Sequence, residues 1–165
     1  MPDLAGRAAG SMMRIIRRLT EALVVFLFST LTLAVFIQVV ARYVFNNPPA
    51  WTEELARFCQ VWIILLTSCI CIRKGSHLAV DYLGPSLSPR VRKFVGVFIG
   101  SLIVAYSAVL TVWGIRLMAV GSMQLSPAIQ INMAAVYAVF PIAGVLMVLE
   151  GTLATVSRLK EGAES

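Results

Sequence analysis

The sequence predicts an all-α membrane protein with four transmembrane helices and both termini in the cytoplasm. Of its 165 residues, 59% are hydrophobic and only 13% are charged, whereas soluble domains are about 45–50% apolar and about 25% charged. A soluble monomer of this size could not bury so much apolar surface. Basic residues are concentrated in the tails and in one loop, and this distribution predicts the orientation.

Four stretches are each long enough to cross a bilayer, which requires about 20 mostly apolar residues. Together they predict a single four-helix membrane domain over residues 1–165, with spans at about 19–41, 53–73, 89–121 and 127–157. Capping residues or serine–proline pairs are expected to start the last three helices, at Thr52, Ser88-Pro89 and Ser126-Pro127. Pro141 then falls inside the fourth helix and is expected to kink it.

The basic residues are distributed unevenly between the two sides of the membrane. Only three of the 14 Lys and Arg residues, Arg42, Arg57 and Arg116, fall on one side. Cytoplasmic loops carry the excess of positive charge, so both termini and the loop between the second and third spans are predicted to be cytoplasmic. The same residues attract anionic membrane lipid. No nucleic-acid partner is expected, because no recognition module is present.

The sequence offers no catalytic residue, metal site or cofactor site. The single histidine, His77, lies in the middle loop, which excludes bis-histidine haem ligation across helices. His77 and Asp81 are four residues apart, and we expect them to form a local hydrogen bond rather than a metal site. The cysteines at 59, 69 and 71 form no C-x-x-C motif, which argues against a thiol oxidoreductase.

Polar and small side chains fall on one face of the second span when it is drawn as a helix. This polar stripe consists of Glu53, Glu54, Arg57, Gln60, Thr67, Ser68 and Cys71. Its first three residues are predicted to form an ion cluster at the outer interface, beside Trp51 as an interfacial anchor. Gln60, Thr67 and Ser68 should face protein rather than lipid, either in the same bundle or in another subunit.

Small residues form a second line along the third span, which we call the glycine seam. Its members are Gly96, Gly100, Ser107, Gly114 and Gly121, and the last four recur every seven residues. Glycines allow helix backbones to approach closely, so the spacing predicts a helix-packing surface. The pattern leaves open whether the neighbouring helix belongs to this chain or to another.

Charged and aromatic residues at fixed spacing between positions 42 and 81 resemble the small membrane subunit, DctQ-like, of tripartite ATP-independent periplasmic (TRAP) transporters. The resemblance rests on Arg42-Tyr43-Val44-Phe45, Trp51-Thr52-Glu53-Glu54-Leu55-Ala56-Arg57, Trp62, Arg73-Lys74-Gly75-Ser76-His77 and Asp81. The length and the four-helix layout agree with that family across nearly the whole chain. One departure is Thr67-Ser68, where family members often have a glycine.

The resemblance implies a non-catalytic scaffold subunit of a sodium-coupled importer of organic acids, such as carboxylates or sugar acids, in the bacterial inner membrane. Its partners would be a large multi-helix transport subunit, which holds the substrate and sodium sites, and a periplasmic substrate-binding protein. The chain would not be an enzyme.

Two other functions are compatible with a small four-helix membrane protein. A self-sufficient proton-coupled exporter would need a membrane-embedded carboxylate in the first helix. Glu21 is the only candidate there, and its edge position beside Arg17 and Arg18 argues against that role. Glu150 also lies toward a cytoplasmic helix end. A quinone-linked thiol oxidase is disfavoured by the cysteine spacing.

Overall fold

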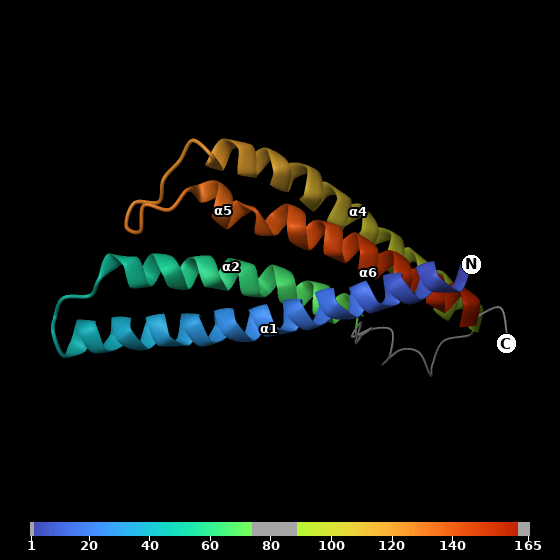
Figure 1. Cartoon of the computed structure of the whole chain (residues 1–165), viewed down its shortest axis with the longest axis horizontal. Coiled ribbons are helices and arrows are strands. Elements are labelled where there is room, and N and C mark those ends of the chain that lie inside the picture. Colours follow the sequence, from blue (N-terminus) through green and yellow to red (C-terminus); the bar gives the residue numbers. More distant parts are fainter. Residues whose placement is uncertain (1, 74–88, 162–165) are drawn as a thin grey trace. The chain divides into compact units, whose positions relative to one another are not determined.

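The computed structural model describes residues 2–73 and 89–161, and in this part of the chain the regular elements are helices (Figure 1). They are α1 (Pro2–Tyr43), α2 (Ala50–Arg73), α4 (Pro89–Gly121), α5 (Met133–Tyr137) and α6 (Val139–Glu161). Four segments are long and apolar enough to cross a membrane: Ser11–Tyr43, Ala50–Arg73, Phe94–Gly121 and Met133–Leu153. The prediction of an all-α protein with four membrane-length helices is therefore confirmed.

The chain divides into two compact units, Met1–Leu66 and Thr67–Ser165. In the first unit, α1 ends in a turn in which the Asn47 amide donates to the Ala41 carbonyl at 3.1 Å. Asn46 has a φ of 49°, a left-handed conformation that asparagine tolerates better than most residues. This turn lets the chain reverse into α2 within residues 44–49.

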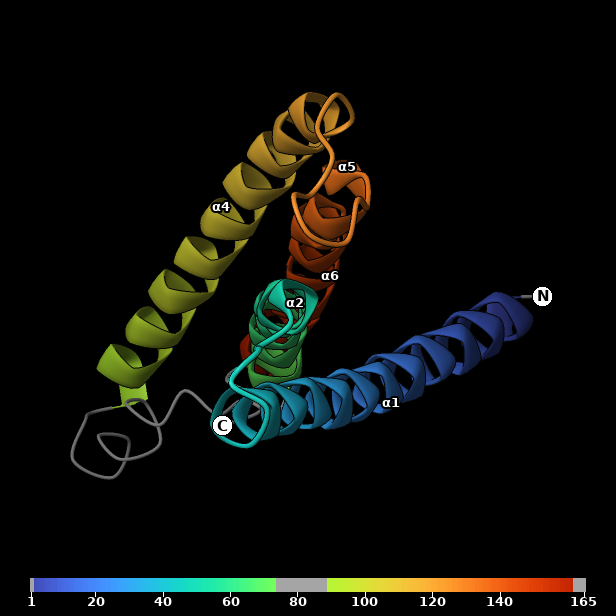
Figure 2. The ribbon, with the colours of Figure 1, turned by 90° about the vertical axis from the view of Figure 1, so that its left-hand side faces the viewer.

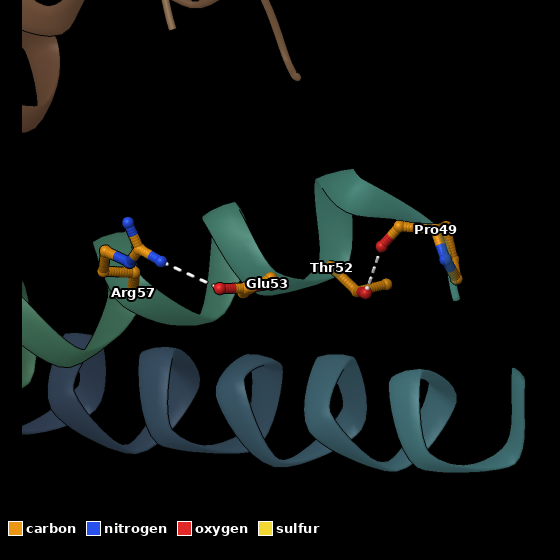
Figure 3. A network of polar contacts seen from close by, with 4 residues as sticks. All are labelled: Pro49, Thr52, Glu53 and Arg57. Carbon is orange, nitrogen blue, oxygen red and sulfur yellow. Dashed lines mark hydrogen bonds and ion pairs between the residues drawn. The ribbon is translucent and has the colours of Figure 1, made fainter. Parts of the chain in front are cut away.

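The start of α2 differs from the prediction. The helix begins at Ala50, so Thr52 lies inside the first turn instead of capping it. Its side chain is fully buried, and its hydroxyl donates to the Pro49 carbonyl at 2.7 Å (Figure 3). Glu53 lies in the same turn, where a carboxylate complements the positive end of the helix dipole.

In the second unit, α4 packs along α5 and α6 (Figures 1 and 2). Glycine on α6 permits the close approach of the two helices. A Cβ atom on Gly144 would overlap the Thr111 hydroxyl and would lie 3.0 Å from the Ser107 carbonyl oxygen. Seven residues later, a Cβ on Gly151 would meet Ile103 at 3.3 Å, a contact that a small shift would relieve.

The predicted start of the fourth helix at Ser126-Pro127 is wrong. The helix begins at Met133 and is capped by Asn132, whose side-chain oxygen accepts from the Ala134 amide at 2.8 Å. Asparagine is one of the residues that best satisfy the free amides of a first turn.

The serine–proline pair lies instead in a closed loop over residues 122–132. An antiparallel bridge joins Leu125 to Asn132, and the Ser126 amide donates to the Ile131 carbonyl at 2.9 Å. The Ser126 side chain is fully buried in this loop. Hydrogen bonds between its two arms therefore determine the conformation of the segment.

A break at Ala138 separates α5 from α6. Pro141 has no amide hydrogen, so it cannot donate to the Tyr137 carbonyl one turn earlier. The Ala138 amide donates to Ala134 at 2.9 Å and the Ile142 amide donates to Ala138 at 3.3 Å, so backbone hydrogen bonds continue across the break. The interruption thus lies where the sequence predicts a proline kink.

Candidate functional site: the exposed face of α2

One side of α2 is buried in the chain. Thr52, Cys59 and Leu66 recur every seven residues and are each at most 4% exposed. Cys69, one turn further on, is also buried, and its thiol donates to the Ala143 carbonyl of α6 at 3.5 Å. These side chains are small or apolar, as close helix packing in a membrane protein requires.

The opposite side of α2 is open. Residues with exposed side chains repeat there at intervals of three, four or seven, which places them on one helix face. We call this set the exposed α2 face, and it consists of Glu53, Arg57, Gln60, Ile64 and Cys71. The other members of the predicted polar stripe, Glu54, Thr67 and Ser68, are half-buried at its margins.

An ion pair lies at the N-terminal end of the exposed α2 face. A guanidinium nitrogen of Arg57 donates to a carboxylate oxygen of Glu53 at 2.9 Å (Figure 3). The two side chains are 69% and 60% exposed, and they are separated by one helical turn. The pair therefore cancels its own charge while leaving polar atoms on the surface.

Gln60 lies deeper along the same face. It is seven residues beyond Glu53, which corresponds to about 10 Å along a helix axis. A side-chain amide in hydrocarbon has no water to bond, and an unpaired polar group there costs several kcal/mol. A hydrogen-bonding protein surface would remove that cost, whereas lipid would not.

The glycine seam of α4 faces the chain's own helices at three of its five positions. The Ser107 side chain is fully buried, and its carbonyl lies beside Gly144 of α6. A Cβ on Gly114 would lie 2.7 Å from the Phe140 Cβ. A Cβ on Gly121 would meet the Tyr137 ring, the nearest atom lying at 2.5 Å.

Gly100 is buried and Gly96 is half-buried, and their packing partners stay a prediction. The contact of Gly144 on α6 with Ser107 and Thr111 on α4 was not predicted from the sequence. The seven-residue spacing of Gly144 from Gly151 repeats the interval of the glycine seam and could have indicated it.

The remaining predicted residues lie away from this face or outside the described residues. Trp51 is the second residue of α2 and is 44% exposed. An aromatic contact not predicted from the sequence lies on α4, where the Arg116 guanidinium stacks 5.2 Å from the centre of the Trp113 ring. His77 and Asp81 lie outside the described residues. Within those residues, no three His, Cys, Asp or Glu side chains gather as metal ligands.

A family comparison identifies the group of proteins to which the chain is related. The sequence model described as "Tripartite ATP-independent periplasmic transporters, DctQ component" matches residues 31–161. The chain belongs to the DctQ family. The resemblance found in the sequence is therefore confirmed, and the chain is a small permease component of TRAP transporters, a non-enzymatic part of a membrane transport system.

Individual relatives support the same assignment. A sialic acid TRAP transporter permease protein, SiaT, of Haemophilus influenzae is 28% identical over 91% of this DctQ-family chain, which spans 24% of that relative. A C4-dicarboxylate TRAP transporter small permease protein of Vibrio cholerae is 28% identical over 56% of the chain and 40% of the relative. A putative TRAP transporter small permease protein of H. influenzae is 30% identical, and 62% of each chain is covered. The chain thus spans less than two thirds of the length of these relatives.

Proposed function

We propose that this chain is a non-catalytic scaffold subunit of a sodium-coupled, binding-protein-dependent importer of organic acids in the bacterial inner membrane. It packs through the exposed α2 face against a larger transport subunit, and a periplasmic substrate-binding protein delivers the substrate to the complex. The observation that carries this proposal is the exposure of Gln60 and of the Glu53–Arg57 pair on a helix long enough to span the membrane.

The chemistry of the exposed α2 face defines what its partner must offer. Near Glu53 and Arg57 the partner needs hydrogen-bonding groups but no net charge, because the pair is already neutral. At Gln60 it needs a donor and an acceptor for the side-chain amide. Ile64, which is 56% exposed, supplies apolar contact area between polar positions. A membrane helix of a partner subunit meets all three requirements.

The scaffold role is supported by the placement of carboxylates along the apolar spans. A chain that moves ions by itself needs an ionisable group in mid-membrane. Glu21 is only two residues inside the apolar run that begins at Leu19, and Glu150 lies in the last third of the apolar run from Met133 to Val156. Both carboxylates are therefore nearer to an end of their apolar run than to its middle.

The substrate class is proposed from the relatives. One relative is named for sialic acid and another for C4-dicarboxylates, and both substrates are organic acids. In the proposed orientation both termini are cytoplasmic, whereas residues 44–49 and 122–132 face the periplasm and Trp51 lies at the outer interface. The substrate and sodium sites would lie in the larger subunit.

Co-purification tests this proposal directly. A tagged chain should capture a larger multi-helix membrane subunit encoded beside it, identified by mass spectrometry. Ile64→Trp should reduce capture at least tenfold, because a large ring on the exposed α2 face would separate the two surfaces. The matched control is Val109→Trp on α4, a position 57% exposed, which should leave capture unchanged. Proton-coupled transport by the reconstituted chain alone, lost on Glu21→Gln, would refute the scaffold role.

A further inference from the structure

The N-terminal part of α1 separates basic from apolar side chains. At 100° per residue, Arg14, Arg17 and Arg18 fall within about 100° of one another. Met12, Ile15 and Leu19 point to the other side and are each at least 57% exposed. We call the first set the arginine face of α1. Glu21 lies on the same side and offsets one of its three positive charges, so the face keeps a net positive charge.

The length of α1 places the arginine face at the membrane surface. The helix has 42 residues, which corresponds to about 63 Å, whereas the hydrocarbon layer is about 30 Å thick. The apolar run from Leu19 to Ala41 already covers about 34 Å. Residues before Leu19 therefore lie outside the hydrocarbon layer.

The depth of the three arginines agrees with that of the lipid headgroups. The headgroup layer adds about 5–7 Å on each side of the hydrocarbon. Arg18 and Arg14 precede Leu19 by about 2 Å and about 8 Å along the helix axis, and Arg17 lies between them. Arg17 and Arg18 lie within that layer, and the long side chain of Arg14 can extend back to its phosphates. On the other side of the helix, Ile15 precedes Leu19 by about 6 Å and lies within the same layer.

We propose that the arginine face of α1 is a binding site for anionic phospholipid, whose phosphates are held by Arg14, Arg17 and Arg18. Guanidinium groups match phosphate oxygens in charge and in bidentate geometry. A water-soluble acidic partner on the arginine face would leave Ile15, on the other side of the helix, exposed to water, whereas lipid headgroups surround the helix at this depth. This proposal rests on the placement of the three arginines along α1 and does not depend on the proposed scaffold role.

The test is lipid retention by the full chain in nanodiscs that contain phosphatidylglycerol and phosphatidylcholine, measured by native mass spectrometry. The wild-type chain should retain phosphatidylglycerol in preference to phosphatidylcholine. Arg14→Gln together with Arg18→Gln should reduce this retention by about twenty-fivefold, since each surface arginine contributes about fivefold. Arg7, Arg17 and the basic middle loop preserve the orientation signal in this variant.

Two matched variants separate phosphate binding from loss of structure. Arg14→Lys with Arg18→Lys keeps the charge and should stay within about threefold of wild type. Glu21→Gln removes the acidic residue of the face and should increase retention. Equal retention by the wild type and the double glutamine variant would overturn the proposal, as would a wild type without preference for the anionic lipid. Displacement of the lipid by 10 mM inorganic phosphate would overturn the assignment to a lipid rather than to a free anion.

Discussion

Gly144→Ala tests the close approach of α4 and α6. The new methyl group would overlap the Thr111 hydroxyl and would lie 3.0 Å from two backbone atoms, the Ser107 oxygen and the Thr111 nitrogen. Backbone atoms cannot rotate away, so the helices must separate, and overpacking of this kind costs about 1–3 kcal/mol. Alanine recovers up to about 1 kcal/mol through its higher helix propensity. The net change should be about 0–2 kcal/mol of destabilisation.

Gly151→Ala is the matched control because it makes the same chemical change on the same helix. Its methyl group would meet only side-chain carbons of Ile103 and Val104, at 3.3 and 3.6 Å. Both variants gain the same helix propensity. The difference between their unfolding free energies therefore measures the cost of the clash at Gly144, about 1–3 kcal/mol. The assay is unfolding in mixed micelles with increasing SDS, followed by tryptophan fluorescence. Equal unfolding free energies for Gly144→Ala and Gly151→Ala would refute the described packing.

Three further substitutions test local features in the same unfolding assay. Asn132→Ala should lower the unfolding free energy by about 1 kcal/mol through loss of the α5 cap. Asn132→Asp keeps the capping oxygen but loses the amide that donates to the Ser122 carbonyl at 3.1 Å, so it should lose less than Asn132→Ala. Equal losses would count against the capping contact. Thr52→Val should cost about 0.5–1.5 kcal/mol, because the Pro49 carbonyl loses the hydroxyl donor and keeps only the Thr52 backbone amide, at 3.3 Å. Thr52→Ser keeps that donor and should cost less, so a similar loss in both would point to packing alone. Glu53→Gln should change the unfolding free energy of the isolated chain by less than about 0.5 kcal/mol, because the pair with Arg57 is exposed. It should nevertheless weaken capture of the larger subunit. A large loss of unfolding free energy in the isolated chain would mean that the pair lies inside the fold.

Hydropathy predicts the membrane helices well because each apolar run must be helical to satisfy its backbone in lipid. The start of the fourth helix could not be predicted in this way. Ser126-Pro127 suits a helix start and a turn equally, and the bridge between Leu125 and Asn132 favours the turn. Because this contact forms between residues seven positions apart in a closed loop, local capping preferences do not reveal it. Asn132 itself is a capping residue directly before the helix.

The faces of the helices were predictable, but their neighbours were not. Periodicity placed Glu53, Arg57 and Gln60 on one side of α2, and it could not tell whether the chain itself covers that side. The structure leaves all three exposed. Similarly, the seven-residue spacing predicted a close approach along α4, whereas the neighbour that Ser107 meets, Gly144, depends on how α6 folds back.

Photo-crosslinking in native membranes tests the central claim, that the exposed α2 face packs against another transport subunit. A photoreactive amino acid would replace Gln60 on α2 and, as the matched control, Val109 on α4. We predict a covalent adduct with the larger TRAP permease subunit from position 60 and none from position 109. Adducts with lipid alone from position 60 would contradict the account, because this face would then border the bilayer.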